Sequence, residues 1–436
     1  MDGFIDNQGN FGADGIVGPH HEKEGSYYTI KQLWSPVQIM NTSINKQFDG
    51  KFSVENRYDY LNLNTCRFLW KQVKFPLATD ASNAAVQVLK EGEVQGSDMV
   101  AHSAGILDIK TNILPNADAL FLTAIDPYGH ELWRWTFPVN KLNQQTEQLS
   151  PLSSRPAYTE TENELTVKAN KRTFIFSKKD GQLKGVSVDN RKISFANGPR
   201  FIGARRADRS LDQFYNHDDP DAEKKKTTYS TFEDTGRFCG FDVEEADGKI
   251  TVTAGYRLGN FDKAVWVITP DGRVSLDFHY NFSGVVDLMG VMFDYPEELV
   301  LSKRWVGDGP YRVWQNRLHG PQLGVWENEY NDPVPGESFV YPEFKGYFAH
   351  VQWMSLHTQE GVIRIWNRTP DSYIGVYQPR DGRDALLYTL PGTGISVMKV
   401  IPPVRNKVNT TDLVGPSSQP KWVDGEQKGS IILCFE

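Results

Sequence analysis

The stretch TVKANKRTFIFSKKDGQLKGVSVDNRKI, residues 166–193, decides the fold class of this chain. Apolar and polar residues alternate in FIFSKK after Thr173 and in KGVSV after Leu183, which is the pattern of half-buried β-strands. The dipeptides Asp180-Gly181 and Asp189-Asn190 stand where tight turns would reverse the chain. The stretch therefore predicts consecutive β-hairpins.

The same alternation recurs along most of the chain, with turn dipeptides between its occurrences. It is found in Lys51 to Arg57, KITVTAGYRL from Lys249, AVWVI from Ala264, RVSLDFHY from Arg273 and GVIRIWN from Gly361. The turn dipeptides are Asp247-Gly248, Asp271-Gly272 and Asp381-Gly382. Helical periodicity is weak, and its best candidate is Tyr27 to Leu33 with Ser26 as the N-cap. We therefore predict an all-β chain.

Composition shifts divide the chain. A proline-, serine- and threonine-rich run begins at Leu149, and we place a linker at residues 151–162. Before it, residues 37–150 carry short alternating strands over the length of an immunoglobulin-like sandwich. After it, residues 163–436 form one large β domain, and residues 1–36 stand apart as an N-terminal segment. A fixed internal repeat is not evident, which disfavours a propeller or a solenoid.

Overall composition excludes several classes of function. The net charge of -8 and the lack of a basic stripe argue against a nucleic-acid partner. Cys66, Cys239 and Cys434 are widely spaced, which gives no support to zinc or redox chemistry. The chain contains neither an 18-residue apolar run nor the pattern of a secretory signal. We expect a soluble protein with no membrane partner, and its compartment stays open.

The run WVGDGPYRVWQNR, Trp305 to Arg317, is the strongest functional motif. Glycines and a proline punctuate a tight turn after an apolar strand, and the following residues direct Tyr311, Trp314 and Arg317 toward one surface. These side chains could line a sugar site. The residue types alone favour the alternative, in which Trp314 packs in a core and Arg317 satisfies buried carbonyls.

This run resembles the G-x-G-P-x-x-x-Y-x-x-R signature in the last domain of family 2 glycoside hydrolases of the β-galactosidase type. Trp314 stands where that family usually has tyrosine. Residues 166–193 resemble the opening strands of the family's small-chain domain, a β-supersandwich also seen in galactose mutarotases. The family's W-R-A-P-T-D-N-D segment is replaced here by FIGARRADRSLD from Phe201. This departure weakens the expectation that the loop keeps the usual sugar contacts.

The N-terminal part carries further resemblance. Residues 11–39 are similar to the exit from the family's catalytic (β/α)8 barrel, with matches at Phe11, Gly15 and Val17. Asp14 stands where asparagine is common, and His20 and His21 replace an Asp-Arg pair. VENRYDYLNL, within the segment from Val37, resembles the sandwich that joins the barrel to the terminal domain. The resemblance thus implies a barrel remnant at residues 1–36, an immunoglobulin-like sandwich and a mutarotase-like supersandwich.

The resemblance implies that the catalytic machinery is missing. Retaining glycosidases need two carboxylates about 5 Å apart, and in this family both are glutamates of the barrel. A barrel needs about 250 residues, far more than precede Phe11. The chain is therefore expected to be a non-catalytic C-terminal region of a β-galactosidase-like enzyme, inactive alone, with a periplasmic or secreted parent.

The expected site follows from the same resemblance. It contains no catalytic residue, metal ligand or cofactor, although a sodium or divalent ion belongs to the expectations for a full-length parent. The expected substrate-binding residues are Phe11, Asp14, Tyr311, Trp314 and Arg317. The expected partners are a β-glycoside, reached through the parent enzyme, and the missing barrel or other subunits.

Substitute carboxylates inside the chain are the first alternative. The candidates are Glu327 with Glu329, Asp218 with Asp219, and Glu343. Glu327 and Glu329 would share one face of a strand, but a solvated loop is the favoured interpretation. His217 beside the two aspartates also suggests a metal site, yet adjacent residues of an extended chain point to opposite faces. The histidine pair at positions 20 and 21 lacks metal-ligand spacing too.

Two other functions remain open. One is a stand-alone carbohydrate-binding module. The other is a mutarotase-like epimerase, which needs a histidine and a carboxylate converging as acid and base on a free sugar. The candidate histidines are His279, His319, His350 and His357.

Overall fold

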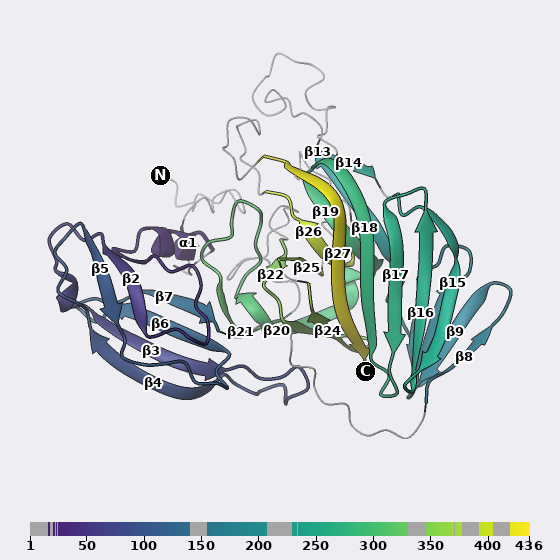
Figure 1. Cartoon of the computed structure of the whole chain (residues 1–436), viewed down its shortest axis with the longest axis horizontal. Coiled ribbons are helices and arrows are strands. Elements are labelled where there is room, and N and C mark those ends of the chain that lie inside the picture. Colours follow the sequence, from purple (N-terminus) through teal and green to yellow (C-terminus); the bar gives the residue numbers. More distant parts are fainter. Residues whose placement is uncertain are drawn as a thin grey trace, which may run out of the picture.

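Two β-sheet bodies lie side by side in the computed structural model (Figure 1). We call residues 37–138 the sandwich and residues 157–435 the supersandwich. The structure describes residues 16–17, 21, 23, 25–139, 155–206, 229–232, 234–329, 346–369, 371–376, 392–403 and 419–436. No helix in these ranges is long and apolar enough to cross a membrane.

One α-helix, α1 (Gly25–Leu33), precedes the sandwich in the described part of the chain. It confirms the predicted helix over Tyr27 to Leu33. The predicted N-cap is wrong, because the helix already includes Ser26. The first turn of the helix packs against the ring of Tyr311, which is distant in sequence: a Cβ built on Gly25 would lie 3.7 Å from two carbon atoms of this ring.

The sandwich consists of two antiparallel sheets. One sheet has the order β1-β2-β5 and the other the order β4-β3-β6-β7. Their bounds are β1 (Val37–Ile39), β2 (Lys51–Asn56), β3 (Arg67–Lys74), β4 (Gln87–Gln95), β5 (Ser103–Asp108), β6 (Ala119–Ile125) and β7 (Glu131–Pro138). The inward side chains of both sheets, such as Phe52, Phe68 and Leu120, form a common core. A 3-10 turn at Leu63–Thr65 precedes β3.

The supersandwich consists of two larger sheets. The first has the order β22-β25-β26-β19-β13-β11-β10-β9-β8, with β12 paired to β11 and β14 to β13. Its strands are β8 (Ala157–Glu160), β9 (Glu164–Ala169), β10 (Arg172–Ser177), β11 (Leu183–Val188), β12 (Arg191–Ile193), β13 (Ala196–Arg206), β14 (Tyr229–Phe232), β19 (Leu288–Asp294), β22 (Phe348–Ala349), β25 (Tyr373–Gly375) and β26 (Ile395–Val400). We call it the outer-strand sheet because it holds the first strands of this body.

The second sheet, called the central-strand sheet, has the order β15-β16-β17-β18-β27-β24-β23-β20-β21. Its strands are β15 (Arg237–Ala246), β16 (Lys249–Arg257), β17 (Phe261–Ile268), β18 (Val274–Val286), β20 (Val300–Gly309), β21 (Gln322–Glu329), β23 (Trp353–Thr358), β24 (Gly361–Asn367) and β27 (Lys421–Phe435). A 3-10 turn at Glu297–Leu299 leads into β20.

The main core fills the space between these two sheets. Trp266 of β17 lies edge-on to Phe176 of β10, with ring centroids 5.6 Å apart. Phe195 stacks on Phe293 of β19 at 4.6 Å. All four rings are inaccessible or nearly so to solvent, and burying each contributes about 2 kcal/mol before entropy is counted. The apolar residues of the alternating segments in these two sheets therefore face this core, and the polar residues between them face away from it.

The structure confirms the predicted all-β fold, with a sandwich followed by a supersandwich. The alternating segments quoted above fall on β2, β10, β11, β16, β17, β18 and β24. Both residues of Asp189-Asn190 and of Asp247-Gly248 have positive φ, as two-residue hairpin turns require. Residues 157–160 of the expected linker instead form β8, because Ala157 to Glu160 pair with β9. The remaining domain boundaries stay predictions, and Asp381-Gly382 lies outside the described residues.

Candidate functional site

The segment after β20 connects the two sheets of the supersandwich. Trp305 is fully buried in β20, and its indole nitrogen donates to the carbonyl of Asp308 at 2.8 Å. The chain then turns at Gly309-Pro310, where a Cβ on Gly309 would lie 2.4 Å from the ring of Trp326. Val313 next pairs with Tyr347, the residue before β22. The predicted turn motif thus directs the chain from the central-strand sheet to the outer-strand sheet.

The motif aromatic residues are buried, not exposed. Tyr311 retains 8% of its accessible surface and Trp314 retains 4%. Trp314 lies edge-on to Tyr347 at 6.1 Å and packs in a small core on the outer-strand sheet. Arg317 is exposed on the following turn. The expectation of an exposed patch containing both aromatic rings is therefore wrong, because Trp314 packs in this small core and Tyr311 packs against Tyr28 of α1.

Sugar contact by Tyr311, Trp314 and Arg317 stays a prediction, now with Arg317 as the exposed member. The other two expected substrate-binding residues, Phe11 and Asp14, lie outside the described residues. The same holds for His20, His217, Asp218, Asp219 and Glu343.

Helix α1 docks on the motif segment. The ring of Tyr28 lies 5.6 Å from the ring of Tyr311. Thr29 donates its hydroxyl to the carbonyl of His319 at 2.9 Å, and Gly320 donates its N–H to the side-chain oxygen of Gln32 at 2.7 Å. Sequence reasoning did not pair these segments, since contacts across almost 290 positions leave no local periodicity.

The sandwich completes this junction. Lys31 of α1 forms an ion pair with Glu131 of β7 at 2.9 Å. Arg134 of β7 donates to the side chain of Gln322, at the start of β21, at 2.8 Å. Residues 25–33, the strand β7 and residues 311–322 therefore meet at one place, which we call the three-way junction.

A histidine and a carboxylate meet beside the motif. The ring nitrogen Nδ1 of His350 lies 2.7 Å from an oxygen of Asp308. This hydrogen bond and the negative charges of Asp308 and Asp371 raise the pKa of His350. Burial, followed by the charge of Asp371, raises the pKa of the neighbouring Tyr373. The imidazole is 67% exposed, so its other nitrogen can exchange protons with solvent or a ligand.

The backbone holds His350 in this position. His350 and Asp371 both have φ in the left-handed region, at 49° and 55°, which is unfavourable for residues with a Cβ. The strand β20 lies close to the backbone next to His350 at Gly307, where an added Cβ would lie 2.9 Å from the Cα of Val351. The placement of the pair is therefore fixed by the fold and not by the two side chains alone.

The other candidate histidines differ. His279 of β18 lies 3.1 Å from Glu426 of β27, which also pairs with Lys428 at 2.9 Å. His319 accepts a hydrogen bond through its carbonyl in the three-way junction. His357 lies in β23, and its side chain makes no hydrogen bond to a carboxylate among the described residues. The structure thus brings two of the four histidines to within hydrogen-bond reach of a carboxylate.

The substitute carboxylates that the structure describes are exposed. Glu327 and Glu329 lie two residues apart on β21, so they share one face as expected. Both are open to solvent, as the favoured interpretation expected, but they lie on a strand and not on the expected loop. In the described part of the chain, no group of three or more histidine, cysteine, aspartate or glutamate side chains is placed to hold a metal ion.

Comparison with known proteins assigns the family. A family model described as the β-galactosidase small chain matches residues 168–397, more than half of the chain. The chain therefore belongs to the β-galactosidase small-chain family. This match covers the supersandwich from β9 to β26, including the motif segment and the His350–Asp308 pair.

Curated relatives agree with this assignment at low identity. The chain is 21% identical over 385 residues to a β-galactosidase of Staphylococcus xylosus, covering 82% of this chain and 35% of the relative. It is 22% identical over 387 residues to a β-galactosidase of Priestia megaterium strain DSM 319 / IMG 1521, covering 82% of this chain and 34% of the relative. The chain thus spans about a third of the length of these relatives.

Two solved structures show a distant likeness. One is a galactose 1-epimerase from Lactobacillus acidophilus NCFM, with 10% identity, coverage of 65% of this chain and 99% of that chain, and a TM-score of 0.37. The other is the protein HI1317, with 9% identity, coverage of 66% and 98%, and a TM-score of 0.30.

Proposed function

We propose that the chain is the C-terminal, non-catalytic region of a retaining β-galactosidase-like glycoside hydrolase. There it completes the rim of the active site and contributes to carbohydrate binding. In such an enzyme, one carboxylate of the barrel attacks the sugar to form a glycosyl-enzyme intermediate while a second carboxyl group protonates the leaving group, and water then hydrolyses the intermediate. The role of the present chain is to hold the barrel exit and to present Arg317 beside it.

The three-way junction is the observation that carries this proposal. By resemblance, α1 follows the exit from the catalytic barrel, and the motif belongs to the terminal domain. The contacts of Tyr28 with Tyr311 and of Gln32 with Gly320 join these two parts directly. A terminal domain held in this way would fix the barrel exit relative to the motif turn.

Hydrolysis assays test the non-catalytic part of the proposal. Purified 1–436 is expected to release nitrophenol from p-nitrophenyl β-D-galactoside and related β-glycosides no faster than buffer. Glu327→Gln and Glu329→Gln variants should behave identically. Turnover in the wild type that either substitution removes would show a catalytic carboxylate inside this chain and would overturn the proposal.

Calorimetric titration with galactose and lactose tests the carbohydrate contact. We expect weak binding that Arg317→Ala reduces at least several-fold. Arg257→Ala is the matched control, because Arg257 is also exposed but lies on β16, in another part of the supersandwich. Equal affinity of both variants would exclude Arg317 from the site. Binding that is insensitive to both would favour a stand-alone carbohydrate-binding module with a different surface.

The His350–Asp308 pair favours a second candidate function, interconversion of the anomers of a free sugar. In this reaction an acid protonates the ring oxygen while a base removes the proton of the anomeric hydroxyl. The ring C–O bond opens to the aldehyde and closes again on the other face, so no cofactor is required. His350 would be the acid, oriented by Asp308, and the neighbouring Asp371 would be the base.

Polarimetry distinguishes this candidate. If it holds, 1–436 accelerates the optical-rotation change of fresh α-D-galactose in proportion to protein concentration. His350→Gln should remove the acceleration and Asp308→Asn should reduce it, while His319→Gln retains it. A rate equal to that of buffer would exclude the epimerase without affecting the first proposal.

A further inference from the structure

The sandwich and the supersandwich share an apolar interface. Val73, Phe75, Ala119 and Phe121 of the sandwich form one cluster with residues of β20, β21 and β23. The supersandwich members are Val306, Leu323 and Trp353. This cluster is small beside the two main cores, and apolar contacts are not directional, so the cluster alone does not fix the orientation of the sandwich relative to the supersandwich. Polar contacts must therefore fix this orientation.

Besides the hydrogen bonds between β7 and β21, which include the one from Arg134 to Gln322, polar contacts converge on the loop between β3 and β4, residues 75–86. The indole nitrogen of Trp353 donates to the carbonyl of Pro76 at 3.0 Å. Arg364 of β24 donates to the carbonyl of Ala78. Arg304 of β20 donates to the carbonyls of Ala81, at 3.1 Å, and Ala84. Three side chains of one sheet therefore bind four backbone carbonyls of one loop.

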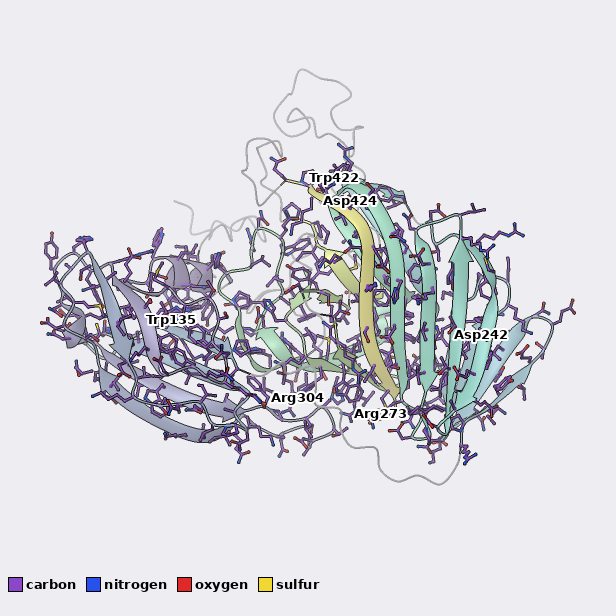
Figure 2. All side chains as sticks on the ribbon, in the orientation of Figure 1. Trp135, Asp242, Arg273, Arg304, Trp422 and Asp424 are labelled. Atoms are coloured by element: carbon purple, nitrogen blue, oxygen red, sulfur yellow. The ribbon has the colours of Figure 1, made fainter. Side chains whose placement is uncertain are left out.

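Arg304 is buried, with 6% of its surface exposed, and its guanidinium donates hydrogen bonds to two carbonyl oxygens. A buried charge is costly unless hydrogen bonds compensate it. The planar guanidinium presents several N–H groups in a fixed fork, so it suits two carbonyls that the loop holds in place. Arg304 lies where the two bodies approach each other (Figure 2).

Hydrogen bonds within the loop hold its conformation independently of the two arginines. Asp80 accepts a hydrogen bond from the N–H of Leu77 at 2.8 Å and donates its own N–H to the Leu77 carbonyl at 3.1 Å. The N–H of Ala84 donates to the carbonyl of Ala81 at 2.8 Å. Little further ordering is therefore needed when the carbonyls meet the guanidinium groups.

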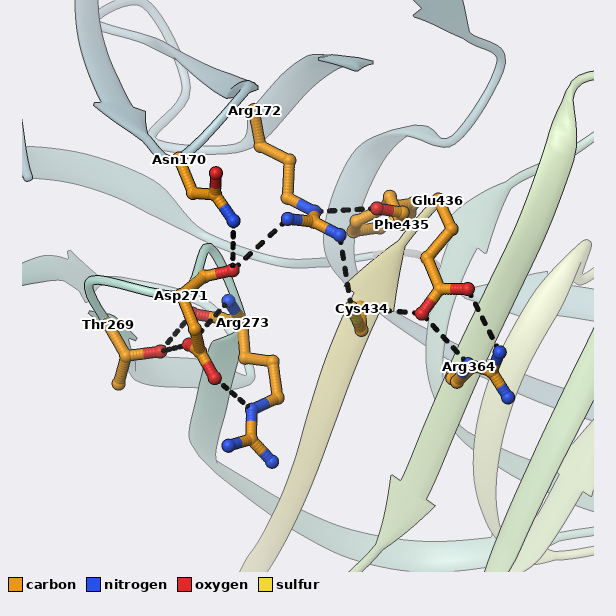
Figure 3. A network of polar contacts seen from close by, with 9 residues as sticks. All are labelled: Asn170, Arg172, Thr269, Asp271, Arg273, Arg364, Cys434, Phe435 and Glu436. Carbon is orange, nitrogen blue, oxygen red and sulfur yellow. Dashed lines mark hydrogen bonds and ion pairs between the residues drawn. The ribbon is translucent and has the colours of Figure 1, made fainter. Parts of the chain in front are cut away.

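Arg364 extends the contact into the supersandwich. It pairs with both carboxylate oxygens of Glu436, at 3.0 and 2.9 Å. Figure 3 shows that this pair continues through Cys434 to Arg172, which donates to the carbonyls of Phe435 and Asp271. The loop is thus attached to a network that ties β27 to the β9–β10 and β17–β18 turns.

We propose that the loop of residues 75–86 is a latch that holds the sandwich and the supersandwich in one orientation, and that Arg304 and Arg364 bind it. Because both arginines bind backbone carbonyls, they recognise the conformation of the loop and not its side chains. The latch reinforces the hydrogen bonds between β7 and β21 and so keeps the three-way junction assembled. Without it, only the small apolar cluster and these few hydrogen bonds would hold the sandwich and the supersandwich in one orientation.

Hydrogen exchange and calorimetry of the full chain test the latch. We expect Arg304→Met to increase exchange at least ten-fold in peptides that cover residues 25–34 and 311–323. Exchange in β9 to β11 should not change. Arg304→Met combined with Arg364→Met should split a single calorimetric transition into two.

Arg273→Met is the matched control, because the Arg273 side chain is only 16% exposed but pairs with Asp271, 2.6 Å away, inside the supersandwich. It should lower the melting temperature without increasing exchange at residues 25–34. Arg304→Lys keeps the charge and loses the planar guanidinium, so it should increase hydrogen exchange by a smaller factor. This variant provides the test even if the Met variant does not fold. Unchanged exchange at residues 25–34 and 311–323 in the lysine variant and in every folded Met variant would overturn the latch.

Discussion

The ring of Tyr311 lies against the ring of Tyr28, with centroids 5.6 Å apart and planes inclined by 43°. Tyr311 comes from the motif after β20, and Tyr28 comes from the helix that precedes the sandwich. The contact joins the beginning of the described chain to the domain that carries the family signature. Among the described residues, the buried hydroxyl of Tyr311 has no hydrogen-bond partner, and burial raises its pKa.

Substitution of Tyr311 should separate the role of its ring from that of its hydroxyl. Tyr311→Phe should leave the free energy of unfolding unchanged or slightly higher, because the hydroxyl makes no hydrogen bond to a described residue that would be lost. Tyr311→Ala should lower it by about 3 kcal/mol, since the ring is buried against α1. Urea unfolding followed by tryptophan fluorescence measures both. A large loss in the Phe variant would mean that the hydroxyl has a partner.

Gly307→Ala should destabilise the chain by about 2 kcal/mol. The added methyl group would lie 2.9 Å from the Cα of Val351 and 3.2 Å from the carbonyl of His350, and both are backbone atoms that cannot move independently. Gly185→Ala in β11 is the control, because its Cβ would lie within 4 Å of no atom of the described residues. Thermal unfolding compares the two variants. Equal melting temperatures would contradict the close approach of β20 to residues 349–351.

The His350–Asp308 pair predicts a small pH dependence of stability. The folded state raises the pKa of His350 above its ordinary value of 6.5, so it favours the protonated imidazole. The resulting stabilisation is fully present below about pH 6.5 and disappears as pH rises through the folded-state pKa. Because the imidazole is 67% exposed, we expect only about 0.5 kcal/mol.

The histidine NMR signals and urea unfolding at pH 5.5 and 8.5 measure this effect. Asp308→Asn should lower the pKa of His350 and reduce the difference in unfolding free energy between the two pH values. His319→Gln should not alter the His350 titration. A His350 pKa that is unchanged by Asp308→Asn would show that the pair does not form in solution.

The three cysteines should differ in reactivity. Cys239 is exposed on β15, whereas Cys66 and Cys434 are buried, and burial raises the pKa of both buried thiols. A thiol reagent such as DTNB should therefore modify one thiol per chain quickly and two more only after unfolding. Cys239→Ser should remove the fast phase. A fast phase that persists in this variant would place another thiol at the surface.

Much of the architecture could be predicted from local patterns. The alternation in Lys249 to Leu258 and in Arg273 to Tyr280 predicted β16 and β18, since a period of two residues directly reports one buried face. The turn after β20 followed from its glycines and proline for the same reason, because such residues set the backbone locally. The family resemblance rested on these same stretches, and the match over residues 168–397 confirms it.

Other features could not be predicted because they depend on which surfaces meet. The spacing of Tyr311, Trp314 and Arg317 is compatible with an exposed patch as well as with a core, and only the packing of Trp314 against Tyr347 decides between them. The linker prediction failed at Ala157 to Glu160 because pairing with β9 outweighs a composition that favours loops.

By itself, the sequence determined the strands, the hairpin turns, the helix and the family, because each is encoded by neighbouring residues or by a contiguous motif. Tertiary structure alone decided that α1 rests on the motif segment, that His350 meets Asp308, and that Arg304 binds the carbonyls of a loop more than two hundred positions away. The reason is physical: a side chain's partner is set by which sheets stack, and a period of two residues specifies only which side of a strand a residue occupies.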